Sequence, residues 1–192
     1  MLMTVMAGVA GAGARERPMG QPATGARQLA FRPFYEDEVR GIYAYVLAIT
    51  GDRWVAEDLT QEAFSRAFRD WDQVSSYDRP GAWVRKVAHN LAASRFRKLA
   101  SEARALARVA GRRERETVEL PEEDAAFWAQ VRRLPSRQAQ AIALHYIQDL
   151  SVAQIALVMG CAEGTAKAHL HRGRTTLAQR LGVTIEHEGE QQ

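Results

Sequence analysis

The sequence predicts an all-α protein with two small helical domains joined by a flexible linker. Apolar residues recur at spacings of three and four along most of the chain, and no segment alternates apolar and polar residues as a half-buried strand would. A length of 192 residues with 46% hydrophobic residues allows two small cores. The segments that we expect are a disordered leader at 1–28, a first domain at 29–98, a linker at 99–124, a second domain at 125–182 and a tail at 183–192.

Three helices and a loop should make up the first domain. A stripe of apolar residues predicts a helix from about Phe34 until Gly51 ends it. A clearly amphipathic helix then follows over 55–71. The segment 75–81 combines aspartate, proline and glycine and is typical of a loop, after which the helical period returns over 82–97.

The second domain should begin near Ala125, after a linker that is first basic and then acidic and has few large apolar residues. A helical start to this linker is an open alternative. Its breaks are predicted around Pro135 and at Gly160. The helices that we expect there are 126–134, 137–147, 151–159 and 163–181.

The last two of these helices have the pattern of a helix-turn-helix unit. Ser151 can cap the shorter helix, Ile155 and Met159 face inward, and Gly160 allows the positive φ that a tight turn needs. In such a unit the second helix presents its first half to the major groove. The alternative is a helical hairpin whose basic face only meets water. The outward positions are Thr165, Lys167, Ala168, His171, Arg172 and Arg174.

Charge is divided sharply along the chain, although the formal net charge is only +3. Ten acidic and four basic residues lie between Phe34 and Asp78, whereas ten basic and two acidic residues lie between Arg85 and Arg115. An acidic surface followed by a basic one suits a protein that contacts both another protein and nucleic acid. The simpler alternative for each is a solvated helix face.

Arginine, lysine and aromatic residues alternate over 83–98, which suits single-stranded nucleic acid, since rings stack on bases and cations follow phosphates. Trp83 fits either such a site or the core. His89 fits DNA contact, the helix surface or a satisfied core position. The acidic face at Asp58 and Glu62 has no histidine at ligand spacing, so a metal site is not indicated.

Four segments in order resemble the extracytoplasmic-function sigma factors of the sigma-70 family. They are AEDLTQEAF at 56–64, WVRKVAHN at 83–90, Leu134-Pro135, and LSVAQIA at 150–156 followed by EGTAK at 163–167. The resemblance implies a sigma-2-like helical bundle and a sigma-4-like helix-turn-helix domain. It further implies two partners, promoter DNA and core RNA polymerase, the latter through the clamp helices of the largest subunit and the flap of the second-largest.

Residue roles follow from the same resemblance. The polymerase-binding set is Asp58, Gln61, Glu62 and Ser65. The set that captures a flipped base of the −10 element is Ser76, Tyr77, Asp78, Trp83, Arg85, Lys86 and Asn90. The set that reads the −35 element is Gly164, Thr165, Lys167, Ala168, His171, Arg172 and Arg174.

We therefore expect a cytoplasmic, non-enzymatic promoter-specificity subunit without a cofactor. An anti-sigma factor is a further expected partner. A stand-alone helix-turn-helix regulator is the alternative. A mean hydropathy of −0.33 excludes an integral membrane protein, and the single Cys161 excludes an internal disulfide. A nuclease would need clustered carboxylates or a metal centre in a basic setting, and the sequence has neither.

Overall fold

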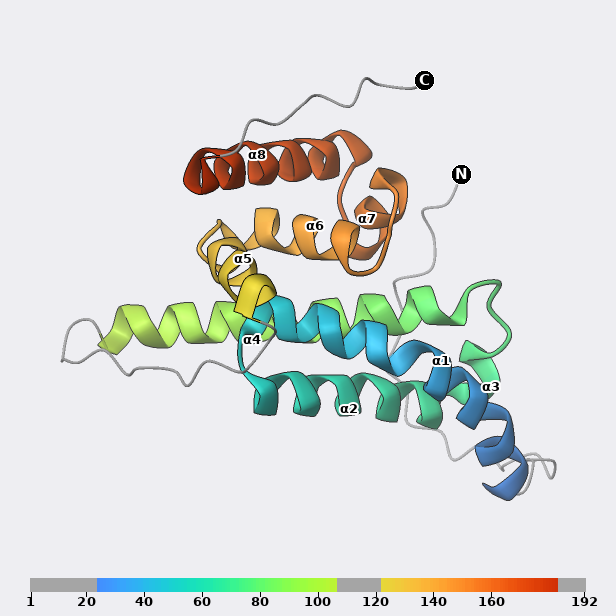
Figure 1. The fold of residues 1–192 in the computed structure, drawn as a ribbon. Helices are drawn as coiled ribbons and strands as arrows, with labels where there is room; N and C mark the ends of the chain where they lie inside the picture. The colour runs from blue at the N-terminus through green and yellow to red at the C-terminus, as the bar shows by residue number, and fades with distance from the viewer. Residues whose placement is uncertain (1–23, 107–121, 183–192) are drawn as a thin grey trace, which may run out of the picture.

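The computed structural model describes residues 24–106 and 122–182, and within these ranges the only regular elements are helices (Figure 1). This confirms the all-α prediction. None of the described helices is long and apolar enough to cross a membrane. The helices are α1 (Thr24–Thr50), α2 (Arg53–Arg69), α3 (Trp71–Val74), α4 (Pro80–Leu106), α5 (Glu122–Arg132), α6 (Ser136–Tyr146), α7 (Val152–Met159) and α8 (Glu163–Leu181).

In the first half of the molecule α1 packs against α2 and α4. Apolar residues at helical spacing bring Ile42 and Val46 of α1 together with Ala63 of α2 and Ala88 of α4, all fully buried. Gly51 separates α1 from α2 with a φ of +66°, a conformation that favours glycine.

In the second half α6 packs against both α7 and α8. The predicted cap is present, because Ser151 and Gln154 form a reciprocal capping box at the start of α7. Gly160 ends α7 with a φ of +62°. Gly173 lets α8 approach α6 closely, since a Cβ there would lie 2.9 Å from Cγ1 of Ile142.

The two halves pack against each other. Figure 1 shows α5, α6 and α8 on the side of α1 that faces away from α2, and contacts join α1 to α5 and α6, and α4 to α7. Buried residues of both halves form one continuous apolar cluster. Arg132 of α5 donates to the carbonyl oxygen of Ala48 in α1 at 3.3 Å. The polar composition of the linker had suggested a loose tether, but the apolar faces of the two halves provide the contact instead.

The helix bounds differ from the predicted ones in several places. Residues 24–28, assigned to the leader, are helical, and α5 begins at Glu122, within the predicted linker. Residues 99–106 extend α4, which agrees with the alternative of a helical start to the linker. The short α3 was not predicted, because Trp71 was placed at the end of the preceding helix. Pro33 disfavours a helix upstream of it, but the ring of Phe31 packs on Phe68 and Trp71 and holds that turn in place. The remaining leader, linker and tail residues, 1–23, 107–121 and 183–192, lie outside the described residues.

Candidate functional site

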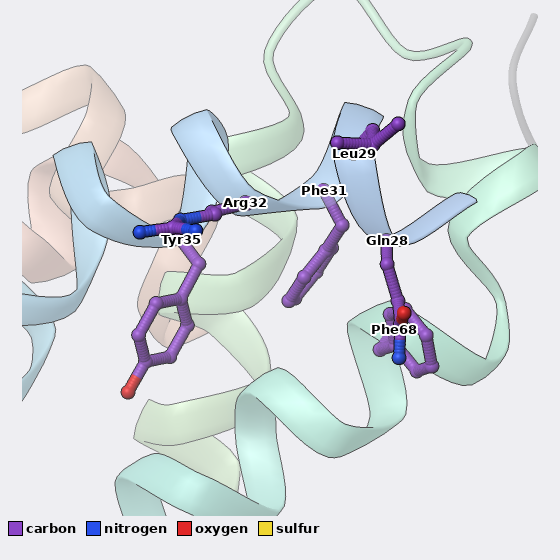
Figure 2. A pocket seen from close by; sticks show the side chains of 6 residues that line it. All are labelled: Gln28, Leu29, Phe31, Arg32, Tyr35 and Phe68. Atoms are coloured by element: carbon purple, nitrogen blue, oxygen red, sulfur yellow. The ribbon is translucent and has the colours of Figure 1, made fainter. Parts of the chain in front are cut away.

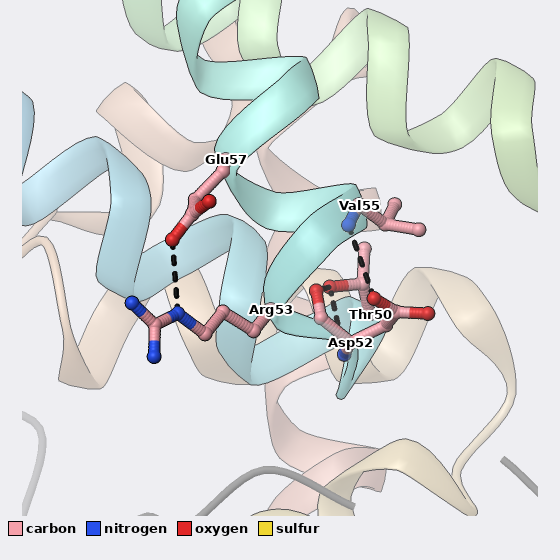
Figure 3. Close-up of polar contacts among 5 residues, drawn as sticks. All are labelled: Thr50, Asp52, Arg53, Val55 and Glu57. Atoms are coloured by element: carbon pink, nitrogen blue, oxygen red, sulfur yellow. Dashed lines mark hydrogen bonds and ion pairs between the residues drawn. The ribbon is translucent and has the colours of Figure 1, made fainter. Parts of the chain in front are cut away.

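The start of α2 is fixed by side-chain contacts (Figure 3). Asp52 caps the helix by accepting from the backbone N–H of Val55 at 3.1 Å. Thr50 donates to the carbonyl oxygen of Val46, and Arg53 pairs with Glu57 one turn along. These contacts set the register in which α2 presents its outer face.

That outer face carries the predicted polymerase-binding set. Asp58, Gln61, Glu62 and Ser65 are all exposed, while Leu59 and other apolar residues on the opposite face enter the core. Glu62 accepts a hydrogen bond from Nε of Arg66 at 2.7 Å. The structure therefore brings these four side chains onto one solvent-facing surface, which we call the α2 face.

Sequence reasoning missed Trp54, whose residue surface is 75% exposed. It lies four residues before Asp58 and seven before Gln61, so it belongs to the same side of the helix. The spacing 54, 58, 61, 65 was a signal that could have identified it. Exposed tryptophans are frequent anchors of protein interfaces, so the α2 face has an aromatic end.

The predicted −10 residues are divided between exposed and packed positions. Ser76, Tyr77 and Asp78 are exposed in the turn before α4, and Lys86 and Asn90 are exposed one turn apart on α4. Trp83 is half-buried against the core, so it combines features of the two alternatives left open for it.

Arg85 is engaged by residues that are distant in sequence. Its Nη2 donates to Oε2 of Glu38 in α1 at 2.5 Å, and its Nε donates to Oε1 of Gln148 at 2.7 Å. Gln148 follows α6 and so belongs to the second half of the molecule. Gly81 makes room for the pair, since a Cβ there would collide with the carboxylate of Glu38. In this arrangement the Arg85 guanidinium is held by both halves of the protein.

His89 belongs to the core rather than to a DNA surface. Its residue surface is 1% exposed, and its Nδ1 lies 2.8 Å from the hydroxyl oxygen of Tyr45. Burial, together with the smaller effect of the nearby Arg137 and Arg97, lowers the pKa of His89 to about 4. Burial raises the pKa of Tyr45, so both side chains are neutral near pH 7.

The outer side of α8 is open in its first half. Gly164, Thr165, Lys167, His171 and Arg172 are exposed, and Ala168 is half-buried. The inner side is closed by packed residues, among them Ala166 and Leu170. The exposed residues therefore form a polar and basic surface with the helix-turn-helix geometry behind it.

Arg174 differs from the other residues predicted to read the −35 element. It is half-buried, and its guanidinium carbon lies 5.4 Å from the centre of the Tyr146 ring, which gives a cation–π contact. This contact joins α8 to α6.

Comparison with known proteins assigns this architecture to a family. The family model described as Sigma-70 region 2 matches residues 34–102, and that described as Sigma-70, region 4 matches residues 124–177. The extracytoplasmic-function (ECF) RNA polymerase sigma factor SigL of Mycobacterium tuberculosis is 30% identical over 177 residues, covering 84% of this chain and 96% of SigL. The chain belongs to the sigma-70 family, among its ECF sigma factors.

Another ECF relative, BldN of Streptomyces coelicolor, is 35% identical over 161 residues, which is 79% of this chain and 60% of BldN. Among solved structures, the sigma factor RpoE in complex with the anti-sigma factor NepR from Bartonella quintana has a TM-score of 0.67 at 24% identity. That match covers 81% of this chain and 99% of the RpoE chain and supports the fold. Within the family assignment, region 2 contains the α2 face and α4 up to residue 102, and region 4 contains α7 and most of α8.

Proposed function

We propose that this ECF sigma factor binds core RNA polymerase, directs it to a restricted set of promoters and assists strand opening, with RNA synthesis left to the polymerase. The observation that carries the proposal is one chain with two open surfaces, an acidic one on α2 in region 2 and a basic one on α8 in region 4. This division suits a subunit that joins a protein partner to DNA. Its place of action is the cytoplasm, and a catalytic role of its own is not part of the proposal.

The residue roles are assigned on the same basis. The α2 face, through Asp58, Gln61, Glu62 and Ser65, contacts the polymerase. The turn at 76–78 and the outer side of α4 contact the −10 element. Exposed polar and basic residues of α8 contact the −35 element, where arginine can bind guanine or phosphate with two hydrogen bonds. A stand-alone helix-turn-helix regulator is not favoured, because the first half matches sigma-70 region 2.

Promoter binding requires the two halves to separate. The −10 and −35 elements lie about 25 base pairs apart, which is about 85 Å of duplex. In the structure α4 contacts α7, and α7 contacts α8, so the two DNA surfaces are held close together. We therefore assign the packed arrangement to the free protein and an extended one to the promoter complex.

The polymerase assignment is tested by reversing one charge on the α2 face. Asp58→Arg should weaken binding of the full chain to core polymerase at least about tenfold and reduce run-off transcription accordingly. The reason is that it replaces an anionic side chain of the proposed contact with a cation. Asp37→Arg is the matched control, since Asp37 is an exposed acid of α1 outside that face. Equal binding of the wild type and both variants would contradict the assignment.

A further inference from the structure

An open apolar groove lies where the start of α1 passes the end of α2 (Figure 2). Its volume is about 630 Å³. All but one of its lining residues come from α1, and Figure 2 shows their side chains around it. The lining residues are Gln28, Leu29, Phe31, Arg32, Tyr35 and Phe68.

The groove exposes large apolar side chains. Leu29 has 76% of its surface exposed and Tyr35 has 38%. Two ion pairs neutralise charges beside it, Arg32 with Glu36 and Arg27 with Asp72. An apolar centre beside paired charges has the anatomy of a protein interface.

The groove has a preformed aromatic wall. The Phe31 ring centre lies 5.2 Å from that of Phe68 and 5.0 Å from that of Trp71, in edge-to-face geometry. It also contacts Phe34, with ring centres 5.8 Å apart. Such packing restricts the rings before any partner arrives, so little side-chain entropy remains to be lost on binding.

Position connects the groove to the α2 face. Phe68 lies three residues after Ser65 on α2, so the groove opens at the end of that face. From Trp54 to Phe68 the helix rises about 21 Å, with apolar groups at both ends and polar residues between them. Figure 1 shows α5 and α6 across α1 from α2, so the second half of the molecule lies away from this surface.

We propose that the groove accepts an apolar side chain of the same core polymerase surface that contacts the α2 face. This rests on the proposed function and extends it. Leu29, Phe31 and the other lining residues before position 34 lie outside the region 2 match, which begins at residue 34. Because the groove continues the α2 face, we assign it the same partner, core RNA polymerase.

Leu29→Asp in the full chain tests the groove. We expect core polymerase to bind this variant at least about tenfold more weakly, because a carboxylate replaces an apolar anchor. Ala30→Asp is the matched control, since Ala30 is exposed on the same turn of α1 but does not line the groove. Both variants should melt like the wild type, because both positions are exposed.

A photo-crosslinking amino acid at position 29 identifies the occupant directly. In the complex with core polymerase it should crosslink to a polymerase subunit. Crosslinking only to residues 1–23 of the same chain, or equal polymerase affinity of Leu29→Asp and Ala30→Asp, would overturn the proposal. If Asp58→Arg still weakens binding in that case, the proposed function stands without the groove; if it does not, both fail.

Discussion

The two surfaces proposed to contact promoter DNA differ in what covers them. On α8 the residues Thr165, Lys167 and Arg172 are exposed, and the packed side of the helix faces inward. On α4, by contrast, the basic residue Arg85 donates hydrogen bonds to Glu38 and to Gln148 of the other half. The structure therefore leaves the proposed −35 surface exposed and engages Arg85 of the proposed −10 surface. Accessibility in this chain is therefore set by contacts between the two halves as well as within each of them.

Acidification should strongly destabilise the core around the buried His89 of α4. His89 has a folded pKa of about 4 against about 6.5 when unfolded, so its contribution to stability is complete above pH 6.5 and is lost as the pH falls toward 4. The loss amounts to about 3 kcal/mol. Urea unfolding at pH 7.5 and pH 4.5 measures it.

The variant that sharpens this measurement is His89→Gln, which keeps a polar partner for Tyr45 and does not titrate. Its stability should depend less on pH than that of the wild type over the same interval. The same pH dependence in both proteins would show that the acid sensitivity originates from a group other than His89.

A smaller effect is expected on α8. Arg172→Ala should cost about 1–3 kcal/mol of binding to −35 duplex DNA if Arg172 reads a base, and should relax preference at one position. If it is a phosphate anchor, the loss is uniform across sequences and the salt slope falls by about one unit. Titration of full-length protein with duplexes at several salt concentrations separates the two. Unchanged affinity and slope would mean that this open surface does not engage DNA at Arg172.

The smallest effect is expected where Gln148 engages Arg85. Gln148→Ala removes one hydrogen bond to Arg85, worth about 1 kcal/mol, and should raise binding of single-stranded −10 DNA about fivefold. Gln179→Ala, exposed on α8, is the control and should change nothing. The gain should disappear when Arg85→Ala is added. If the gain persists without Arg85, then Gln148 does not restrict DNA binding through the Arg85 side chain.

Local patterns predicted the helix-turn-helix unit closely. Ser151 caps α7, Gly160 ends it, and α8 spans Glu163–Leu181 as expected, because capping, left-handed turns and helical period are encoded within a few neighbouring residues. Exposure of the α2 face followed from the same period.

Long-range contacts were not predictable in this way. Arg85 is 47 residues from Glu38 and 63 from Gln148, and no local period relates them. The early start of α1 likewise depends on the contacts of Phe31 with Phe68 of α2 and Trp71 of α3. A helical pattern predicts which side of a helix is polar, but the partner that covers a polar residue is a property of the assembled fold.

The distance between α4 and α8 distinguishes the packed arrangement assigned to the free protein from the extended one assigned to the promoter complex. A dye pair at Ser94→Cys and Gln179→Cys, both exposed, reports this distance once Cys161 is replaced by alanine. Energy transfer should be efficient in the free protein. It should fall sharply in the complex with core polymerase and promoter, where the elements are about 85 Å apart. Equal transfer efficiency in the two states would show that the two halves do not separate in the promoter complex.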